Sequence, residues 1–283
     1  MELLTHQALS VAAGLTLQLL AWLAPLRTQS GEKETRWDLT AMLCGVGFAH
    51  IYTFLVAVPL SGLLVSLAPV QQWQAWVGTG PLWQTWILYL VLGDFLAYWA
   101  HRWLHGRLFW HSHAWHHSPK HIWWLSGLRA SPLHVVLLML PYTVSYLVFP
   151  LDATGLALFG VILFGIANQH WLHSNIRVPF PRQLEWLVVT PRYHFVHHSA
   201  DKRFTNSNYG FIFTVWDRLF GSHTPPERVA PDERLGLDYD NSNVRFLLGL
   251  PPATVTDRGT APSSEGRERP QAKEEGAAPA LPD

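Results

Sequence analysis

The chain alternates long apolar runs with short polar segments. Residues 9–26 are almost entirely apolar, and a run of this length can cross a bilayer as one helix. It lacks the basic start and small-residue cleavage site of a signal peptide, so we expect it to be retained. Residues 39–70 form a second run, in which Pro59 and Gly62 predict an interruption.

The apolar pattern continues through the middle of the chain. A third run begins near Leu82 and ends in a histidine-rich segment, and residues 133–150 and 154–168 form two further runs joined by a short PLDA turn. The uncharged segment 71–81, with two tryptophans, is typical of a membrane interface. The pattern therefore predicts an all-α integral membrane protein with about four to five transmembrane helices.

The last hundred residues differ in composition. The segment from Arg177 to about Leu250 is more polar and predicts a helical, histidine-rich cap. Beyond Pro251 the chain is rich in Pro, Ala, Gly, Glu and Arg and almost free of large apolar residues, which predicts disorder.

Basic residues are distributed asymmetrically between the predicted loops. Lysine and arginine occur between residues 27 and 38, after the third run, and at Arg177, whereas the segment 71–81 and the PLDA turn have none. If all five runs cross the membrane, these basic residues lie on one side, which the positive-inside rule makes cytoplasmic. The histidine-rich segments lie on that same side, so we expect a multi-pass protein whose histidine cap faces the cytoplasm.

Composition limits the kinds of function. Of 283 residues, 49% are hydrophobic and only 14% are charged, and the 20 Lys+Arg equal the 20 Asp+Glu. This balance argues against a nucleic-acid partner. The single cysteine, Cys44, excludes a disulfide framework and a thiolate metal cluster. Any metal site must therefore use mainly imidazole ligands.

Histidines recur at helical spacing in three short motifs. HRWLH places His101 and His105 four residues apart, on one face of a helix. HAWHH and HFVHH each repeat a spacing of three and four residues. One divalent ion takes about four to six ligands, so these histidines suit two ions better than one.

The metal chemistry separates two kinds of protein. A structural zinc site usually includes cysteines, which this pattern lacks. A two-metal centre at a membrane surface instead suggests oxygen chemistry on a lipid C–H bond, which needs a redox metal and dioxygen. The alternative is a histidine-rich membrane metal-binding or transport protein without oxygenase activity. The enzyme is favoured because the histidines lie at span ends and in the cap rather than along a path through the membrane.

The motifs HRWLH, HAWHH and HFVHH, with GDFLAYWAHR, LHSNI, NYG and WDRLFG around them, resemble the fatty acid hydroxylase/sterol desaturase superfamily of membrane diiron enzymes. The resemblance covers about residues 85–222. It implies a helical membrane fold, two iron ions, dioxygen as co-substrate, and hydroxylation or desaturation of a lipid such as a sterol, a fatty acyl chain or an ether lipid. The metal ligands that it implies are His101, His105, His113, His116, His117, His173, His194, His197 and His198.

The resemblance also implies a division of the chain and one departure from the family pattern. We expect a transmembrane region at 1–80, a catalytic domain at 81–225, a cap segment at 226–250 and a disordered tail at 251–283. Some relatives have a histidine where this chain has Gln169; His170, beside it, is an alternative ligand. A glutamine here resembles the alkylglycerol monooxygenase branch, which hints at an ether lipid.

Several other residues are candidates for supporting the ligands. Asp94 shares a helical stripe with His101 and His105, so it could accept a hydrogen bond from a ligand imidazole, or instead pair with Arg102 or bind a buried water. Further candidates, for ligand support or for cap packing, are Asn208, Tyr209 and Asp217. The role of His134, in the membrane interface or in a pocket, stays open. No nucleotide, haem or flavin motif is recognisable, so we expect a separate electron donor, cytochrome b5-like or ferredoxin-like.

Overall fold

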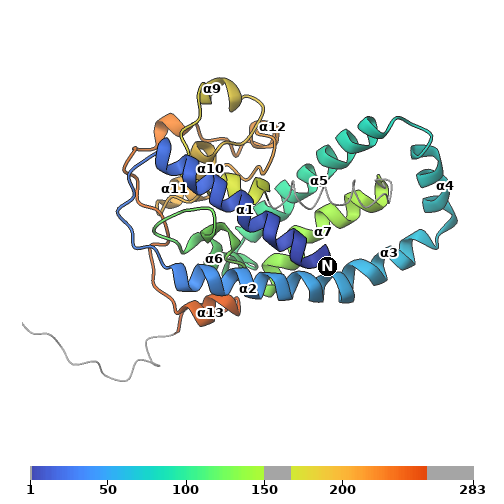
Figure 1. Ribbon diagram of the computed structural model, residues 1–283, viewed down its shortest axis with the longest axis horizontal. Helices are drawn as coiled ribbons and strands as arrows, with labels where there is room; N and C mark the ends of the chain where they lie inside the picture. Colours follow the sequence, from blue (N-terminus) through green and yellow to red (C-terminus); the bar gives the residue numbers. More distant parts are fainter. Residues whose placement is uncertain (1, 150–166, 254–283) are drawn as a thin grey trace, which may run out of the picture. The chain divides into compact units, whose positions relative to one another are not determined.

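The computed structural model describes residues 2–149 and 167–253, which are helical with three isolated β-bridges and no longer strand (Figure 1). The all-α prediction is confirmed for these residues. The helices are α1 Glu2–Leu23, α2 Thr35–Tyr52, a π-helical segment Thr53–Ala57, α3 Val58–Val65, α4 Ala68–Val77, α5 Leu82–Leu104, α6 Trp110–His117, α7 Pro132–Val148, α9 Pro181–Leu184, α10 Pro191–His197, α11 Lys202–Thr205, α12 Val215–Leu219 and α13 Asn243–Leu247, with 3₁₀ turns at Ser126–Leu128 and Pro226–Arg228.

The second apolar run forms one continuous helix. Residues Thr35–Val65 join α2, the π-helical segment and α3, and among the described residues this is the helix long and apolar enough to cross a membrane. The wide π turn lies just before Pro59, whose ring would clash with the carbonyl of a regular preceding turn. Gly62 does not interrupt the helix, so that part of the prediction was wrong.

The other predicted crossings correspond to α5, to shorter apolar helices or to residues outside the description. Shorter apolar helices cover Ala8–Leu23 and Pro132–Val148. The run at 154–168 and the tail at 251–283 lie largely outside the described residues. Four to five crossings and the cytoplasmic position of the cap therefore stay predictions.

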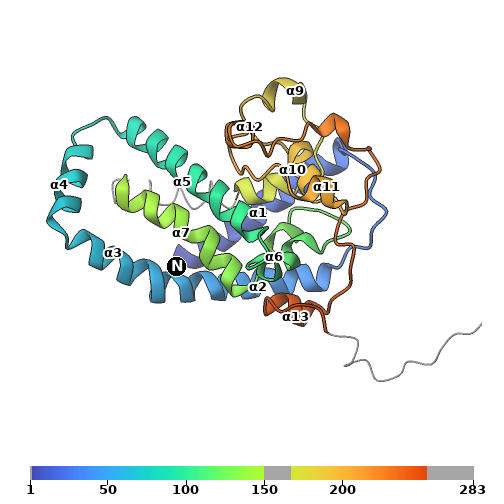
Figure 2. The same ribbon diagram turned by 180° about the vertical axis from the view of Figure 1, so that it is seen from behind.

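Helices α5 and α7 pack side by side over much of their length, in both views of the chain (Figures 1 and 2). Gly93 makes the close approach possible, since a Cβ there would lie 2.8 Å from the ring of Tyr142. Tyr89 lies one turn before Gly93 in α5, and its carbonyl accepts a hydrogen bond of 2.6 Å from Ser145 Oγ of α7. This pairing carries the C-terminal end of α5 into the histidine-bearing part of the chain, residues 105–131 and 173–250, which we call the cap.

A buried ion pair attaches the cap to the start of α2. Arg129, from the loop before α7, donates from Nε to Asp38 at 2.7 Å and from Nη1 to Glu34 at 2.9 Å. The indole of Trp123 donates to the other Asp38 oxygen at 2.7 Å. Arg129 and Asp38 are both only 1% exposed, so removing either partner would leave a buried charge unpaired.

Candidate metal centre

Nine histidines, eight from the cap and His101 from the end of α5, converge as two separate groups of ring nitrogens. In each group the ligand atoms all lie within 4.8 Å of one another. The first group is His101, His105, His113, His117 and His197, and the second is His116, His173, His194 and His198. These are the nine residues that the family resemblance implies, and the structure brings all nine together.

The short helices α6 and α10 divide their histidines between the two groups in opposite ways. From α6, the first and last histidines of HAWHH enter the first group and His116 enters the second. From α10 and its C-cap, His194 and His198 enter the second group and His197 enters the first. In each motif the histidines at i and i+4 share one helix face, and the histidine at i+3 lies to one side of that face. When the two motifs face each other, the i and i+4 pair of one therefore joins the i+3 histidine of the other.

Local sequence fixes where α10 begins. Thr190 is its N-cap, with Oγ1 accepting from the backbone N–H of Tyr193 at 3.2 Å, and Pro191 follows at the first helical position. The start of the helix is therefore fixed, with His194 and His197 within it and His198 at its C-cap.

The distances within each group fit ligands around an ion. In the first group, His113 Nε2 lies 3.2 Å from His101 Nε2 and 3.0 Å from His117 Nε2. In the second, His173 Nε2 lies 3.1 Å from His198 Nε2 and 3.2 Å from the Nε2 atoms of His116 and His194. Two nitrogens about 2.1 Å from one ion, at angles of about 90–109°, are separated by about 3.0–3.4 Å.

The opposite ring nitrogens show which atoms carry the protons. Nδ1 faces a backbone carbonyl in three of the rings: His101 faces Tyr209 at 2.8 Å, His197 faces Ser207 at 2.8 Å, and His173 faces Gln169 at 2.9 Å. A carbonyl can only accept, so in these rings Nδ1 bears the hydrogen and Nε2 presents a lone pair to the cluster.

Several of these lone pairs converge in a dry interior. Nε2 of His197 and Nε2 of His105 are buried without a hydrogen-bond partner among the described residues. Leaving such atoms unpaired costs about 1–3 kcal/mol each. A bound cation accepts several lone pairs at once, so the residues present fit two metal ions.

Burial also keeps the cap imidazoles neutral. Removal from water lowers the pKa of His173 to about 4. Removal from water, followed by repulsion between neighbouring rings, lowers the pKa well below its ordinary value in six others, His113, His116, His117, His194, His197 and His198. Neutral imidazole is the form that binds a metal.

Among the described residues, the Asp94 carboxylate makes no hydrogen bond to a histidine. Its carboxylate accepts hydrogen bonds from the backbone N–H groups of Ile212 and Phe213 and from the indole of Trp216, at 2.8–3.0 Å. Arg102 donates instead to the Tyr98 hydroxyl and a backbone carbonyl. The predicted hydrogen bond to a ligand imidazole and the predicted pair with Arg102 were therefore wrong, and the carboxylate of Asp94 ties α5 to the loop that precedes α12.

Asp217 supports the centre through the backbone. It accepts from the backbone N–H groups of Tyr209 and Gly210 at 2.8 and 2.9 Å, and from the hydroxyls of Ser222 and Tyr193. Burial raises the pKa of this carboxyl to about 6, and the hydrogen bonds oppose that rise. Asp217 thus holds in place the backbone whose carbonyl orients His101.

Asn208 shapes the same loop. Its backbone adopts the left-handed conformation (φ 56°), which asparagine tolerates better than most residues. Its side chain donates to the carbonyls of Tyr193 and Thr224 and accepts from the Thr224 N–H. Of the four supporting candidates, Asn208, Tyr209 and Asp217 therefore lie in or against the loop that orients two ligands.

Three residues left open by the sequence have defined places. His134 Nδ1 lies 3.2 Å from His113 Nδ1. His134 is therefore the hydrogen-bond partner of the ligand His113, on the side of the ring that faces away from the cluster. His170 contacts Ser10 at 2.9 Å and Gln169 donates to the carbonyl of Gly127 at 3.1 Å, both outside the groups. His170 as a replacement ligand was therefore wrong. Sequence reasoning missed Ser207 and Gly127, whose contribution is made by backbone.

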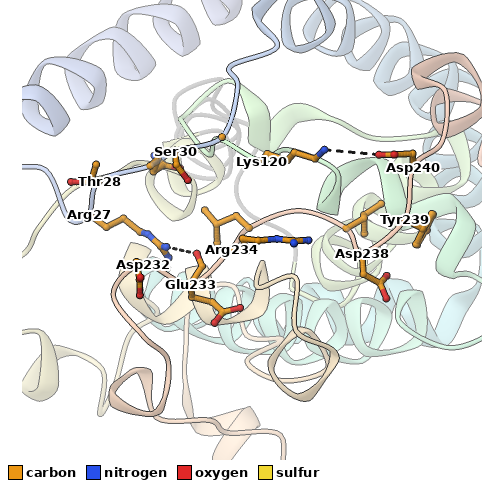
Figure 3. A pocket seen from close by; sticks show the side chains of 14 residues that line it. Arg27, Thr28, Ser30, Lys120, Asp232, Glu233, Arg234, Asp238, Tyr239 and Asp240 are labelled. Atoms are coloured by element: carbon orange, nitrogen blue, oxygen red, sulfur yellow. Dashed lines mark hydrogen bonds and ion pairs between the residues drawn. The ribbon is translucent and has the colours of Figure 1, made fainter. Parts of the chain in front are cut away.

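Two cavities lie apart from the histidine groups. A cleft of about 520 Å³ is lined by the polar segments 27–31 and 232–240 with Lys120 (Figure 3). Figure 3 shows Lys120 facing Asp240 and Arg27 facing Glu233 across it. A second cavity of about 260 Å³ lies between α1 and residues 121–124. None of the nine histidines lines either cavity.

Comparison with known proteins places the histidine motifs in a family. Residues 86–222 match the fatty acid hydroxylase family. The chain is 31% identical to alkylglycerol monooxygenase of Xenopus tropicalis over 146 residues, 50% of this chain and 31% of that protein. It is 33% identical to human lathosterol oxidase over 145 residues, 50% of this chain and 45% of that protein. It is 34% identical to a putative Δ7-sterol-C5(6)-desaturase of Arabidopsis thaliana over 147 residues, 49% of this chain and 48% of that protein.

The chain thus spans less than half of the length of each of these relatives. No solved structure is significantly similar to it. The matched residues contain all nine clustered histidines and lie inside the predicted catalytic domain at 81–225. The resemblance drawn from the motifs is confirmed.

Proposed function

We propose that this chain, whose residues 86–222 make up a fatty acid hydroxylase domain, is a membrane-bound, oxygen-dependent diiron enzyme that hydroxylates or desaturates a lipid at an unactivated C–H bond. The observation that carries the proposal is the convergence of nine histidines, eight of them buried, into groups of five and four. Matches to an alkylglycerol monooxygenase and to a lathosterol oxidase support the reaction class.

Each histidine group would hold one ion. Bound iron supplies redox chemistry with dioxygen, which zinc lacks. The protein contributes the arrangement of the ligands. The carbonyls of Ser207, Tyr209 and Gln169 hold protons on the outer nitrogens of three ligands, so their inner lone pairs are directed into the site before any metal binds.

The dry surroundings of the centre suit the same chemistry. Eight of the nine histidines are buried, and aromatic side chains of Tyr209 and Phe211 pack against His101 at ring-centroid distances of 5.7 and 4.8 Å. Excluding water protects a reactive centre from side reactions. A multi-pass membrane location, a cytoplasmic cap and a separate electron-donor protein complete the proposal, supported by the apolar helix Thr35–Val65 and by the asymmetry of basic residues.

The names of the relatives indicate candidate substrate classes. Ether lipids and sterols are the first candidates, since the relatives are named for alkylglycerol and lathosterol. Gln169 does not favour either of them, because its side chain hydrogen-bonds to Gly127 rather than pointing into the centre.

The test uses the full chain in lipid nanodiscs, loaded with iron and supplied with a chemical or protein reductant and ¹⁸O₂. Alkylglycerols, sterols and fatty acyl lipids are offered separately. We expect one class to give either a product carrying one ¹⁸O or a product lacking two hydrogens, and we expect His197→Ala to give neither. An iron-loaded, reduced protein that converts none of these lipids would contradict the proposal and favour a metal-binding or transport protein.

A further inference from the structure

Large apolar side chains gather on the outside of the cap over two segments that lie side by side. We call this set the α9/α12 patch: Phe180, Leu184, Trp186, Leu187, Val215 and Leu219. All six are exposed, and the largest exposed fractions are 73% for Phe180, 72% for Trp186 and 66% for Leu219. A soluble surface rarely leaves so many large apolar side chains together in water.

Hydrogen bonds hold the two segments of the patch together. The N–H of Thr214 donates to the carbonyl of Leu187 at 3.1 Å, and Arg218 donates to the carbonyl of Glu185 at 2.7 Å. The guanidinium of Arg218 also lies 4.6 Å from the ring of Trp186. The patch is therefore one built surface, and both views show α9 and α12 next to each other (Figures 1 and 2).

The α12 part of the patch is attached to α5. Trp216 lies in α12 between the patch residues Val215 and Leu219. Its ring centroid is 5.1 Å from that of Phe95 in α5, and its indole N–H donates a hydrogen bond to the Asp94 carboxylate. Asp94 precedes His101 by seven residues, so this contact lies about 10 Å along α5 from the metal centre, toward the other end of the helix. The patch is thus at the level where α5 leaves the cap.

An apolar stripe on α5 leads directly to the patch. Trp83, Ile87 and Val91 recur every four residues and are all exposed. The next position of the stripe is Phe95, which Trp216 covers. Val215 and Leu219 of α12 continue the exposed apolar surface beyond that point. Such continuity is expected where α5, which the sequence predicts to span the membrane, and the neighbouring α12 meet the same bilayer.

The charges and the backbone of the patch fit a lipid surface. The two acidic residues of these segments, Glu185 and Asp217, are buried. Arg182 forms an ion pair with Glu227 at 2.9 Å, which leaves Arg218 as the basic side chain beside Trp186. An arginine beside an exposed tryptophan suits the boundary between acyl chains and phosphate groups. Phe180, an exposed aromatic residue, has a left-handed backbone conformation (φ 48°), which is strained for a bulky side chain.

We propose that the α9/α12 patch inserts into the bilayer interface and seats the cap on the membrane, separately from the spanning helices. The occupant is the lipid surface itself: aromatic and aliphatic side chains enter the acyl boundary, and Arg218 faces the phosphate groups. This inference requires a membrane-bound chain, but neither a metal nor a reaction. Its failure is therefore distinct from failure of the proposed enzyme function.

The experiment places one fluorescent probe at a time on the full chain. Cys44 is first replaced by alanine, and a single cysteine is then introduced as Leu187→Cys or Leu219→Cys. The matched control is Leu248→Cys, another exposed leucine of the cap, which follows α13 rather than the patch. Each variant is labelled with an environment-sensitive dye in nanodiscs of phosphatidylcholine and phosphatidylserine, with and without doxyl-labelled lipid.

We expect dye at positions 187 and 219 to emit at shorter wavelength than dye at 248 and to lose intensity with doxyl lipid. Dye at 248 should be unaffected by the quencher. Water-like, unquenched emission at 187 and 219 would overturn the proposal. So would shorter-wavelength emission that doxyl lipid leaves unchanged, because a second copy of the chain or another protein would then cover the patch.

Discussion

Gly127 lies against the second histidine group, which makes Gly127→Ala a sharp test of that group. A Cβ added at this position would lie 2.4 Å from both Cγ and Nδ1 of His173. The neighbouring atoms belong to a rigid, buried ring rather than to the end of a flexible side chain. Gly127 does not have a positive φ, so alanine can adopt its backbone conformation, and the cost of the substitution is the steric clash with His173.

The size of the effect follows from the distances. Ordinary contact needs about 3.4 Å or more, so the His173 ring must move by about 1 Å or the backbone must retreat. His173 Nε2 is 3.1–3.2 Å from three other ligand nitrogens, so a shift of this size misaligns it from the site. Overpacking of this kind costs about 1–3 kcal/mol of stability. Even modest changes around a ligand weaken metal affinity about ten- to a hundredfold.

The assay is metal content per chain after purification with iron supplied and a mild chelator present. We expect the wild type to retain two ions and Gly127→Ala to retain about one, because the first group does not include His173. Gly45→Ala, in α2, is the matched control, since a Cβ there meets nothing within 4 Å. Two ions of unchanged affinity in Gly127→Ala would refute the assignment of His173 to a metal site.

Further predictions concern other contacts. Asp94→Asn should leave at least one of three donors unpaired and lower the unfolding free energy by about 1–3 kcal/mol, seen as a lower melting temperature in detergent. Gly14→Ala places a methyl group 2.2 Å from the ring of Trp124 and should destabilise the protein by about 1–3 kcal/mol in the same assay. His134→Phe keeps a ring but removes the partner of one ligand, so competition with a chelator should show metal affinity about ten- to a hundredfold weaker. Because folding lowers the pKa of His173 from 6.5 to about 4, the metal-free protein should keep this contribution to stability above pH 6.5. As the pH falls from 6.5 toward 4, His173 alone contributes a loss of about 1.4 kcal/mol per pH unit, and the other buried histidines with lowered pKa make the total loss steeper. Denaturation at several pH values tests this, and a flat profile would contradict it.

Helical spacing predicted which histidines share a face, but not how they divide between two groups. His116 and His117 are adjacent in sequence and enter different groups, as do His197 and His198. The division depends on how α6 faces α10, which is a tertiary relation that periodicity within one helix does not contain. The ligand identities were accessible because imidazole at i, i+3 and i+4 is a strong chemical pattern.

The supporting contacts were harder to predict for a physical reason. Two ligands are oriented by the carbonyls of Ser207 and Tyr209, and every residue has a carbonyl, so side-chain chemistry gives no signal. Asp94 was correctly singled out as a carboxylate within an apolar helix, yet its donors come from residues 212–216, more than a hundred positions away. Gly127 carries no side chain, and its importance comes only from the space that His173 occupies.

The boundaries of the apolar helices show a similar limit. Pro59 and Gly62 predicted an interruption, but a π-helical turn before the proline keeps the helix continuous to Val65. Such a wide turn accommodates the proline ring at small cost, and propensity alone does not reveal it.

The central claim is that the two histidine groups each hold one metal ion, and the most direct test is iron content per chain in group-specific variants. The wild type, purified in nanodiscs with iron supplied, should contain two irons. His197→Ala should reduce the first site and His194→Ala the second, each leaving about one iron, and the double variant should contain close to none. A wild type without bound metal, or single variants that both keep two ions, would contradict the account.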